Sequence, residues 1–398
     1  MGICAAAALG QSQGAAAFDV QAEEWHLTAM HADELWKVST GEGVKVAVID
    51  TGVNDKTPAL KGQVLTDNVP AESSRNGTDD FKGHGTTMAE LIAGTGAGGG
   101  IKGLAPGSKI IPFRMDDSKA GKKGLTSADA IRAAADSDAR IINMSFGADY
   151  YGQDEREAVA YAEKKGKLLF ASAGNDGEDH DNFFHYPAAY PGVVGVAAAD
   201  KSGKVGKFSQ SGDFVSLASP GLNEPIWCDT SFKSYCPSQG TSQASAIASA
   251  AAALIWSIHP KWTANQVLNV MLDTAGRDWP KDEPSKYLGY GLVRPAPNLL
   301  DGKGDPGPAD INPLTGRKTT GSTPDKSGTS ESPAASQAPK GGKGPGSVGD
   351  GQSAGEDSAA SESDSSGSGR TWLIVGIVAA VVVIGGGAFA FARRGRAN

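Results

Sequence analysis

The sequence predicts an α/β fold in which helices cover both faces of a mostly parallel central sheet. Short apolar runs of strand length alternate with longer helical segments through the middle of the chain. Polar residues such as Asp50, Ser145 and Ser172 end several of these runs, and active sites of open α/β sheets gather at such strand ends. With 398 residues, the chain can hold one large domain of this kind plus extensions.

The predicted strands are short, mainly apolar runs, as expected for strands that are buried on both faces of a sheet. They comprise residues 44–50, 109–113, 140–145, 167–172, 193–199 and 214–217.

The predicted helices lie between and beyond these strands and complete the alternation. They comprise residues 32–38, 84–93, 127–136, 154–165, 241–257 and 263–273.

Three residues combine to suggest nucleophilic catalysis. Ser242 lies at the start of an Ala-rich helical run, Asp50 ends a buried strand, and His84 opens a helix between two glycines. A hydroxyl is a poor nucleophile at neutral pH, so it needs an imidazole to take its proton and a buried carboxylate to orient that imidazole. The sequence therefore predicts Asp50, His84 and Ser242 as a catalytic triad.

Other residues of the same types were weighed for these roles. Asp79 and Asp80 precede His84, but they lie in a polar loop for which a solvated turn is the ordinary explanation. The remaining histidines do not sit between glycines at a helix start, and His26, His31 and His259 suit partly exposed or packing positions. The remaining histidines are His26, His31, His180, His185 and His259.

Four short motifs give the chain a family resemblance over roughly residues 25–300. They are Asp50-Thr51-Gly52, Gly83-His84-Gly85-Thr86, Ser172-Ala173-Gly174-Asn175 and Gly240-Thr241-Ser242. In this order they resemble the signature blocks of the subtilases, and the chain order Asp, His, Ser is that of subtilisin. The resemblance implies a subtilisin-like three-layer fold and a serine endopeptidase that works through an acyl-enzyme.

The resemblance also assigns further site residues. Asn175 and the Ser242 amide complete an oxyanion hole, and His185, just before Tyr186 and Pro187, lies at the base of the S1 pocket, which implies small or modest P1 side chains. An extended substrate pairs between two backbone segments, which are Gly124 and Leu125 on one side and Ser145, Phe146 and Gly147 on the other. One departure from the family is Ala246, where a proline is usual; its loss is expected to relax the helix start without removing activity.

Composition limits the other function classes. The net charge of −8 leaves no basic footprint for a phosphate backbone, so nucleic-acid binding is not expected. No cofactor or metal is assigned. The acidic loop with Asp176, Glu178, Asp179 and Asp181 has oxygens that suit calcium, but its spacing matches no calcium loop and a solvated loop is favoured.

The extracytoplasmic location is predicted from the C-terminus. Residues 372–391 form an uncharged apolar run long enough to span a membrane, followed by Arg393, Arg394 and Arg396, which are expected to remain cytoplasmic. The alternative, a buried core helix, is disfavoured because the run follows a Gly/Ser/Pro-rich stretch, residues 301–370, that is expected to be disordered.

In an exported protein Cys228 and Cys236 are expected to form a disulfide; in a cytosolic one they would be free thiols.

The predicted organisation is therefore a possible signal and extension at 1–24, a peptidase domain at 25–300, a linker at 301–370, a transmembrane helix at 371–392 and a cytoplasmic tail at 393–398. The N-terminal segment has an apolar run and small residues suited to cleavage, but no Lys or Arg precedes Lys37. We interpret it as a truncated signal, with a degenerate signal as the alternative.

The layout resembles one subtilase group in particular. The segment 25–36, the lack of a propeptide-sized segment, the single C-terminal anchor and the Arg-tipped tail resemble the mycosins, which are associated with type VII secretion. The resemblance implies peptide or protein substrates and a type VII secretion complex as partner. The rival interpretation is a scaffold that stabilises such a complex, with proteolysis secondary.

Overall fold

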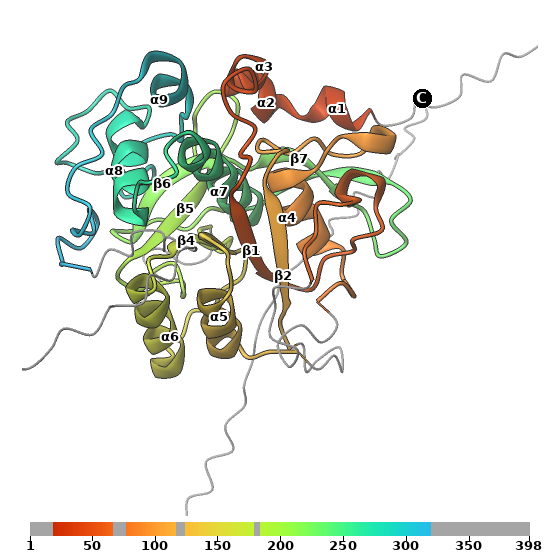
Figure 1. Cartoon of the computed structure of the whole chain (residues 1–398), viewed down its shortest axis with the longest axis horizontal. Helices are drawn as coiled ribbons and strands as arrows, with labels where there is room; N and C mark the ends of the chain where they lie inside the picture. Colours follow the sequence, from red (N-terminus) through yellow and green to blue (C-terminus); the bar gives the residue numbers. More distant parts are fainter. Residues whose placement is uncertain (1–18, 67–76, 117–123, 179–183, 320–398) are drawn as a thin grey trace, which may run out of the picture. The chain divides into compact units, whose positions relative to one another are not determined.

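Six parallel strands form the central sheet of the computed structural model, which describes residues 19–66, 77–116, 124–178 and 184–319 (Figure 1). Their order across the sheet is β2-β1-β3-β4-β5-β6, so β1 lies in the interior with β2 and β3 beside it. The strands are β1 Lys45–Asp50, β2 Lys109–Arg114, β3 Ile141–Met144, β4 Leu168–Ser172, β5 Val193–Ala199 and β6 Val215–Pro220. An antiparallel pair, β7 Leu222–Trp227 and β8 Tyr235–Gln239, forms a separate two-stranded sheet.

The longer helices differ in their connections: the first three join consecutive parallel strands as in βαβ units, and the last two follow the hairpin β7–β8. They are α4 His84–Ala93, α5 Ser127–Asp136, α6 Gln153–Lys164, α7 Thr241–Ile258 and α8 Ala264–Thr274. Shorter helical turns are α1 Val20–Glu23, α2 Trp25–Ala29, α3 Ala32–Leu35, η1 Pro58–Leu60, η2 Ala97–Gly99 and α9 Ala296–Asp301.

The sheet separates two apolar cores. In β1, Val46 and Val48 belong to the core that the sheet shares with α4, α7 and α8, while Ala47 and Ile49 belong to the core that it shares with α5 and α6. This division follows from the alternation of side chains along a strand. Burial on both faces explains why the strands are apolar throughout, and the structure has the three layers that the sequence predicts.

The strands and helices predicted between residues 32 and 273 are confirmed, with shifts of a few residues at their ends. The hairpin β7–β8 was not predicted. Its strands mix exposed polar residues with Pro225 and Pro237, which gives neither a continuous apolar run nor a clear alternation.

The fold continues beyond residue 300 into a stretch that composition assigned to the linker. Residues 301–319 are held largely by polar contacts: the Ala309 carbonyl accepts hydrogen bonds from Thr263 and Asn265, and Asn312 donates to Glu163 at 2.7 Å. A composition poor in large apolar residues did not reveal these contacts, because they depend on partners in α6 and α8.

The predicted signal segment, most of the linker, the transmembrane helix and the arginine tail lie outside the described residues, as do His180, Asp179 and Asp181. Within the described part of the chain, α7 is the one helix long and apolar enough to cross a membrane by length and composition, and 89% of it is buried in the core. Its apolar character is explained by its position against β3, β4, β5 and β6.

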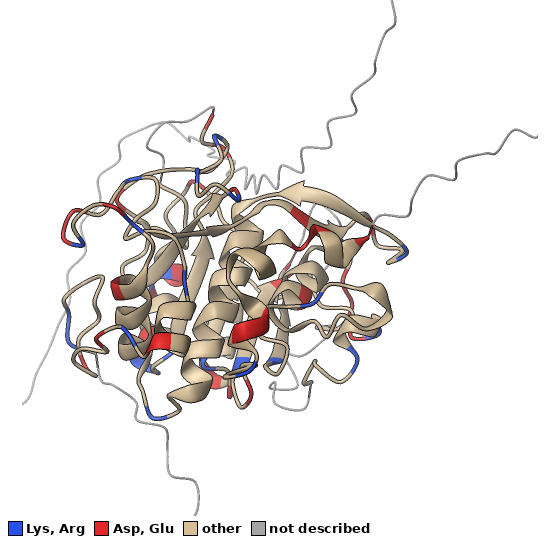
Figure 2. Ribbon diagram, turned by 90° about the horizontal axis from the view of Figure 1, so that it is seen from above, with Lys and Arg blue, Asp and Glu red and all other residues tan. Residues whose placement is uncertain are grey.

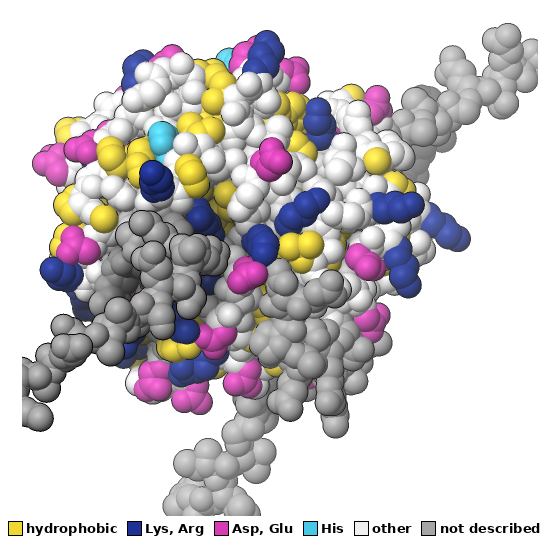
Figure 3. All heavy atoms as spheres, in the orientation of Figure 1, with side chains coloured by type: hydrophobic (Ala, Val, Ile, Leu, Met, Phe, Trp, Pro, Cys, Tyr) yellow, Lys and Arg dark blue, Asp and Glu magenta, His cyan; other side chains and the backbone are white. Residues whose placement is uncertain are grey.

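Charged residues lie in the loops and on some of the helices around this core (Figure 2). On the face drawn in Figure 3, lysines and arginines are interspersed with aspartates and glutamates, and apolar side chains appear in small groups.

Candidate active site

Asp50 lies at the carboxyl end of β1 and is almost fully buried. Its Oδ1 accepts hydrogen bonds from the Thr51 amide and from His84 Nδ1, both at 2.7 Å. The start of α4 approaches this strand end closely, and a Cβ at Gly85 would overlap the Gly52 carbonyl oxygen and lie 2.9 Å from Asp50 Cβ. Glycine after His84 therefore allows the imidazole to reach the carboxylate.

His84 is the first residue of α4, and its side chain is 38% exposed. Burial acts to lower the pKa of His84, but the charge and hydrogen bond of Asp50, helped by the charge of Asp80, outweigh burial and raise the pKa above its ordinary value. The imidazole is thus oriented and made more basic by the buried carboxylate.

Asp80 stabilises the loop that leads to His84 through hydrogen bonds. Its two carboxylate oxygens accept hydrogen bonds from the Thr51 hydroxyl and from the amides of Lys82, Gly83 and Thr86. The side chain is buried, whereas the sequence suggested a solvated turn. No local pattern predicted this role, because Asp80 is not the N-cap of α4 and its partner Thr51 lies 29 residues away.

Ser242 is the second residue of α7, where backbone amides have no partner within the helix. Its hydroxyl donates to the Ser145 carbonyl at 3.2 Å, and the Ser145 hydroxyl donates to the Ser242 carbonyl at 3.0 Å. Between His84 and Ser242, both of which are described, no hydrogen bond is formed. The start of α7 thus lies beside the end of β3, at the same edge of the sheet as Asp50.

Asn175 follows β4 and faces the same helix start. Its Oδ1 accepts hydrogen bonds from the amide and the hydroxyl of Thr241, both at 3.0 Å. These bonds use the carbonyl side of the side-chain amide and leave its NH₂ group as a donor near the start of α7, where Nδ2 lies 3.8 Å from the position of a Cβ at Gly240. The Ser242 amide is the second donor at this position.

The two predicted substrate segments also lie at the carboxyl edge. Leu125 pairs with Met115, just beyond β2, and its amide donates to the Arg114 carbonyl at 3.0 Å. Ser145, Phe146 and Gly147 follow β3 directly. Since β1 lies between β2 and β3, the two segments flank the strand that carries Asp50.

The His185 ring lies between two glycine backbones. A Cβ at Gly147 would overlap the ring, and a Cβ at Gly174 would lie 2.9 Å from its Cδ2. Its Nδ1 donates to the Ser172 carbonyl at 3.2 Å. Burial lowers the pKa of His185, against the opposing effects of the Ser172 carbonyl and of Asp176 and Asp149. His185 therefore links the segment after β3 with the segment after β4.

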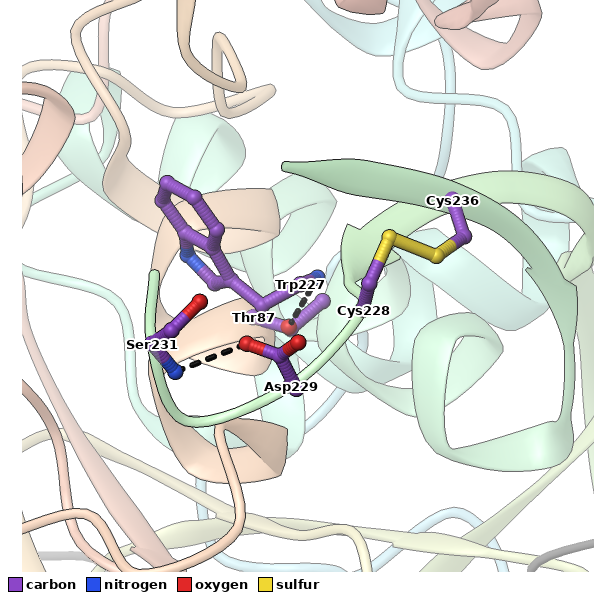
Figure 4. The surroundings of a disulfide bond; sticks show 6 residues. All are labelled: Thr87, Trp227, Cys228, Asp229, Ser231 and Cys236. Atoms are coloured by element: carbon purple, nitrogen blue, oxygen red, sulfur yellow. Dashed lines mark hydrogen bonds between the residues drawn. A yellow bond between two sulfur atoms is a disulfide. The ribbon is translucent and has the colours of Figure 1, made fainter. Parts of the chain in front are cut away.

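The predicted disulfide is confirmed: Cys228 and Cys236 are bonded, with their Cα atoms 5.3 Å apart (Figure 4). No group of three or more His, Cys, Asp or Glu side chains suited to a metal ion occurs within residues 19–66, 77–116, 124–178 and 184–319.

A six-stranded parallel sheet that carries Asp, His and Ser at its carboxyl edge defines the subtilisin-like class of serine peptidases. Comparison with known families agrees: residues 41–291 match the Subtilase family, and the chain belongs to it.

Among characterised relatives, the chain is 35% identical over 307 residues to fervidolysin of Fervidobacterium pennivorans. The aligned region covers 68% of this chain and 43% of fervidolysin. The chain thus spans less than half the length of that protein. Among solved structures it is similar to the MycP3 protease from the type VII (ESX-3) secretion system, at 29% identity and a TM-score of 0.58, over 69% of this chain and 87% of the other. It is equally similar to the serine protease MycP1, described as an essential component of the type VII (ESX-1) secretion system, at 29% identity and a TM-score of 0.58, over 69% and 88% of the two chains.

Proposed function

We propose that the protein is a serine endopeptidase that hydrolyses peptide bonds through an acyl-enzyme, with Asp50, His84 and Ser242 as its triad. The observation that carries this proposal is the 2.7 Å hydrogen bond between His84 Nδ1 and Asp50 Oδ1, at the edge of the sheet where α7 presents Ser242. A carboxylate-oriented imidazole beside a serine at a helix start is the arrangement that activates a hydroxyl. Membership of the subtilase family supports the same reaction.

The reaction begins when the Ser242 hydroxyl turns from the Ser145 carbonyl toward His84. His84 Nε2 takes the hydroxyl proton as Oγ forms a bond to the scissile carbonyl carbon, and Asp50 stabilises the resulting imidazolium. The imidazolium then gives this proton to the leaving amine as the C–N bond breaks, which leaves an acyl-enzyme. Water, deprotonated by His84, cleaves the ester and regenerates the hydroxyl.

The oxyanion formed in each step needs donors that are already in place. The Asn175 NH₂ group and the Ser242 amide supply two, and the positive end of the α7 dipole adds to their effect. Thr241 fixes the orientation of Asn175 through the two hydrogen bonds to its Oδ1. The donors therefore need little reorganisation when the charge develops.

A fluorophosphonate probe tests this function directly. The wild-type protein should be labelled, and Ser242→Ala should lose both labelling and peptide cleavage while its melting temperature stays close to that of the wild type, because the hydroxyl contributes little packing. Ser257→Ala is the matched control, since it removes a hydroxyl at the other end of the same helix, where it donates to the Glu42 carbonyl. Turnover of Ser242→Ala within tenfold of the wild type would overturn the triad.

We further propose that residues 372–391 tether the peptidase to a membrane with its active site outside the cytoplasm. The apolar run and the arginines after it support this topology. Protease added to intact cells should release the peptidase domain by cutting within residues 320–370, and a tag placed after Asn398 should stay protected. A tag that is digested from outside would reverse the topology.

The similarity to the MycP1 and MycP3 proteases supports a type VII secretion complex as the partner of this protein. A scaffold role in that complex is the second candidate function. Cells that carry Ser242→Ala separate the two: assembly that persists without cleavage supports a scaffold role beside the peptidase, while assembly that fails with the folded variant ties the role to proteolysis.

A further inference from the structure

The hairpin β7–β8 connects the two helices on which the proposed triad depends. β8 ends at Gln239, and the chain passes through Gly240 directly into α7 and Ser242. The other strand, β7, ends at Trp227, which lies against α4, the helix that begins with His84. The disulfide Cys228–Cys236 closes the loop between the strands (Figure 4).

On the α4 side, Thr87 joins the hairpin to the turn that carries His84. The Trp227 amide donates to Thr87 Oγ1 at 3.2 Å, and the Thr87 hydroxyl donates to the Gly83 carbonyl at 2.9 Å. A Cβ at Gly83 would lie 3.4 Å from the Asp229 carbonyl oxygen and 3.5 Å from Trp227 Cβ. The loop beyond β7 is therefore in contact with the residue before His84.

A second bond joins the hairpin to the next turn of α4. The Tyr235 hydroxyl, at the start of β8, donates to Glu90 Oε2 at 2.9 Å, while Glu90 Oε1 accepts from the Thr57 hydroxyl at 2.7 Å. Glu90 is fully buried, so both bonds are shielded from water. The rings of Trp227 and Tyr235 stack with their centroids 3.8 Å apart, which makes the two contacts with α4 one unit.

On the α7 side, the start of the hairpin lies on the turn that carries Ser242. The Gly240 amide donates to the Gly221 carbonyl at 2.8 Å. A Cβ at Gly221 would lie 2.7 Å from the Gly240 carbonyl oxygen and 3.1 Å from Ala244 Cβ. The backbone before β7 thus packs directly on the first turn of α7.

We propose that the disulfide-closed hairpin β7–β8 holds the helix start that carries His84 in place relative to the one that carries Ser242, with Tyr235 and Thr87 as positioning residues. The inference rests on the proposed function. Proton transfer from Ser242 to His84 requires the two side chains to come within hydrogen-bond reach, and neither is bonded to the other in the resting structure. A displacement of about 1 Å between such groups can cost 10²-fold in rate, so the hairpin acts on kcat.

The test uses paired substitutions in the full-length protein. Tyr235→Phe and Thr87→Val each remove one hydroxyl with little change in volume, and Thr87→Ser restores the hydroxyl. The double variant Cys228→Ser with Cys236→Ser opens the loop. We expect Tyr235→Phe, Thr87→Val and the double cysteine variant each to lower kcat per probe-titrated active site by about tenfold or more. KM should stay nearly unchanged, because the substrate segments lie on other elements. Thr87→Ser should recover most of the kcat.

Tyr287→Phe is the control, because it makes the same chemical change at a tyrosine whose side chain is 61% exposed. If the hairpin contributes only stability, the variants will have lower melting temperatures but an unchanged kcat per titrated site well below those temperatures, and the proposal is overturned. Should Tyr235→Phe fail to fold, Thr87→Val and the cysteine variant carry the same test. Failure of the proposed function itself looks different: the wild type would not react with the probe, or Ser242→Ala would still react.

Discussion

His26 and Glu224 form a fully buried pair that joins the N-terminal segment to β7, with His26 Nδ1 2.6 Å from Glu224 Oε2. A third buried group, Glu24, interacts with both members of the pair, and the buried Glu90 interacts with Glu24. Burial acts to lower the pKa of His26, but the charge and hydrogen bond of Glu224, with the charge of Glu24, outweigh it and raise the pKa. The N-terminal segment is thus held by groups whose charges depend on pH.

The first prediction is that stability falls as pH rises from about 5 to 9. Burial raises the pKa of Glu24 from 4.5 to about 8 and that of Glu90 to about 7. Groups with a raised folded-state pKa contribute stability that is complete below the unfolded pKa and is lost as pH rises through the folded one. His26 adds to the loss, because its raised pKa lets the folded state keep a proton that the unfolded state gives up above 6.5. Once His26 itself loses that proton, the buried Glu224 has no cationic partner. Melting temperatures across this range measure the effect.

Glu24→Gln should flatten that pH dependence, because the glutamine stays neutral and can still accept the hydrogen bond that the Lys102 amide now gives to Glu24 at 2.7 Å. Glu23→Gln makes the same change at the preceding, exposed residue and should leave the slope as it is. A slope unaffected by Glu24→Gln, or stability that rises over this range, would contradict the assignment.

The elements of the sheet and the residues at its edge could be predicted because their signals are local. The run that ends in Asp50 and the glycines around His84 are visible within a few residues of sequence. His26 was expected to be a partly exposed or packing residue, because its partner Glu224 lies 198 residues away. Asp80 and the hairpin escaped prediction for the same reason: their roles are set by contacts with Thr51 and α4 that no local pattern encodes.

The second prediction concerns the pH dependence of activity. His84 must be neutral to accept the Ser242 proton, and Asp50 raises the pKa of His84 above 6.5. The value of kcat/KM should therefore rise with pH through an apparent pKa above 6.5 and level off in the alkaline range. Asp50→Asn should move this limb to lower pH and reduce kcat by about 10⁴-fold, because the imidazole loses its charge partner and correct tautomer.

Asp79→Asn is the control for the loss of a nearby negative charge. The Asp79 side chain is 62% exposed, so solvent should screen its effect and the limb should move little. An Asp50→Asn limb that coincides with the wild-type limb would show that another group governs the profile.

The third prediction concerns the oxyanion donors. Asn175→Ala should lower kcat by about 10² to 10³ with little change in KM, since the oxyanion exists only beyond the ground state. The alanine also removes the acceptor of the Thr241 hydrogen bonds, so Asn175→Asp is the informative partner: it keeps that acceptor but replaces the NH₂ donor with an oxygen. Steady-state kinetics should show both variants impaired. Near-normal kcat in Asn175→Asp would mean that Asn175 serves only to hold Thr241.

The last prediction concerns the P1 preference. The His185 ring lies against Gly147 and 2.9 Å from where a Cβ at Gly174 would be, so it fills space between the proposed substrate segment after β3 and the segment after β4. Large apolar P1 residues should therefore be excluded, and His185→Gly should raise kcat/KM for Phe and Leu relative to Ala. Filling such a space with one apolar group is worth roughly 1 to 3 kcal/mol, which corresponds to a gain of about 10- to 200-fold.

His31→Gly, a change at an exposed histidine with a φ of 59°, is the matched control and should leave the profile unchanged. A library of peptides that differ only at P1 measures both variants, and a His185→Gly profile identical to that of the wild type would place the ring outside the subsite and leave its hydrogen bond to Ser172 as its structural role.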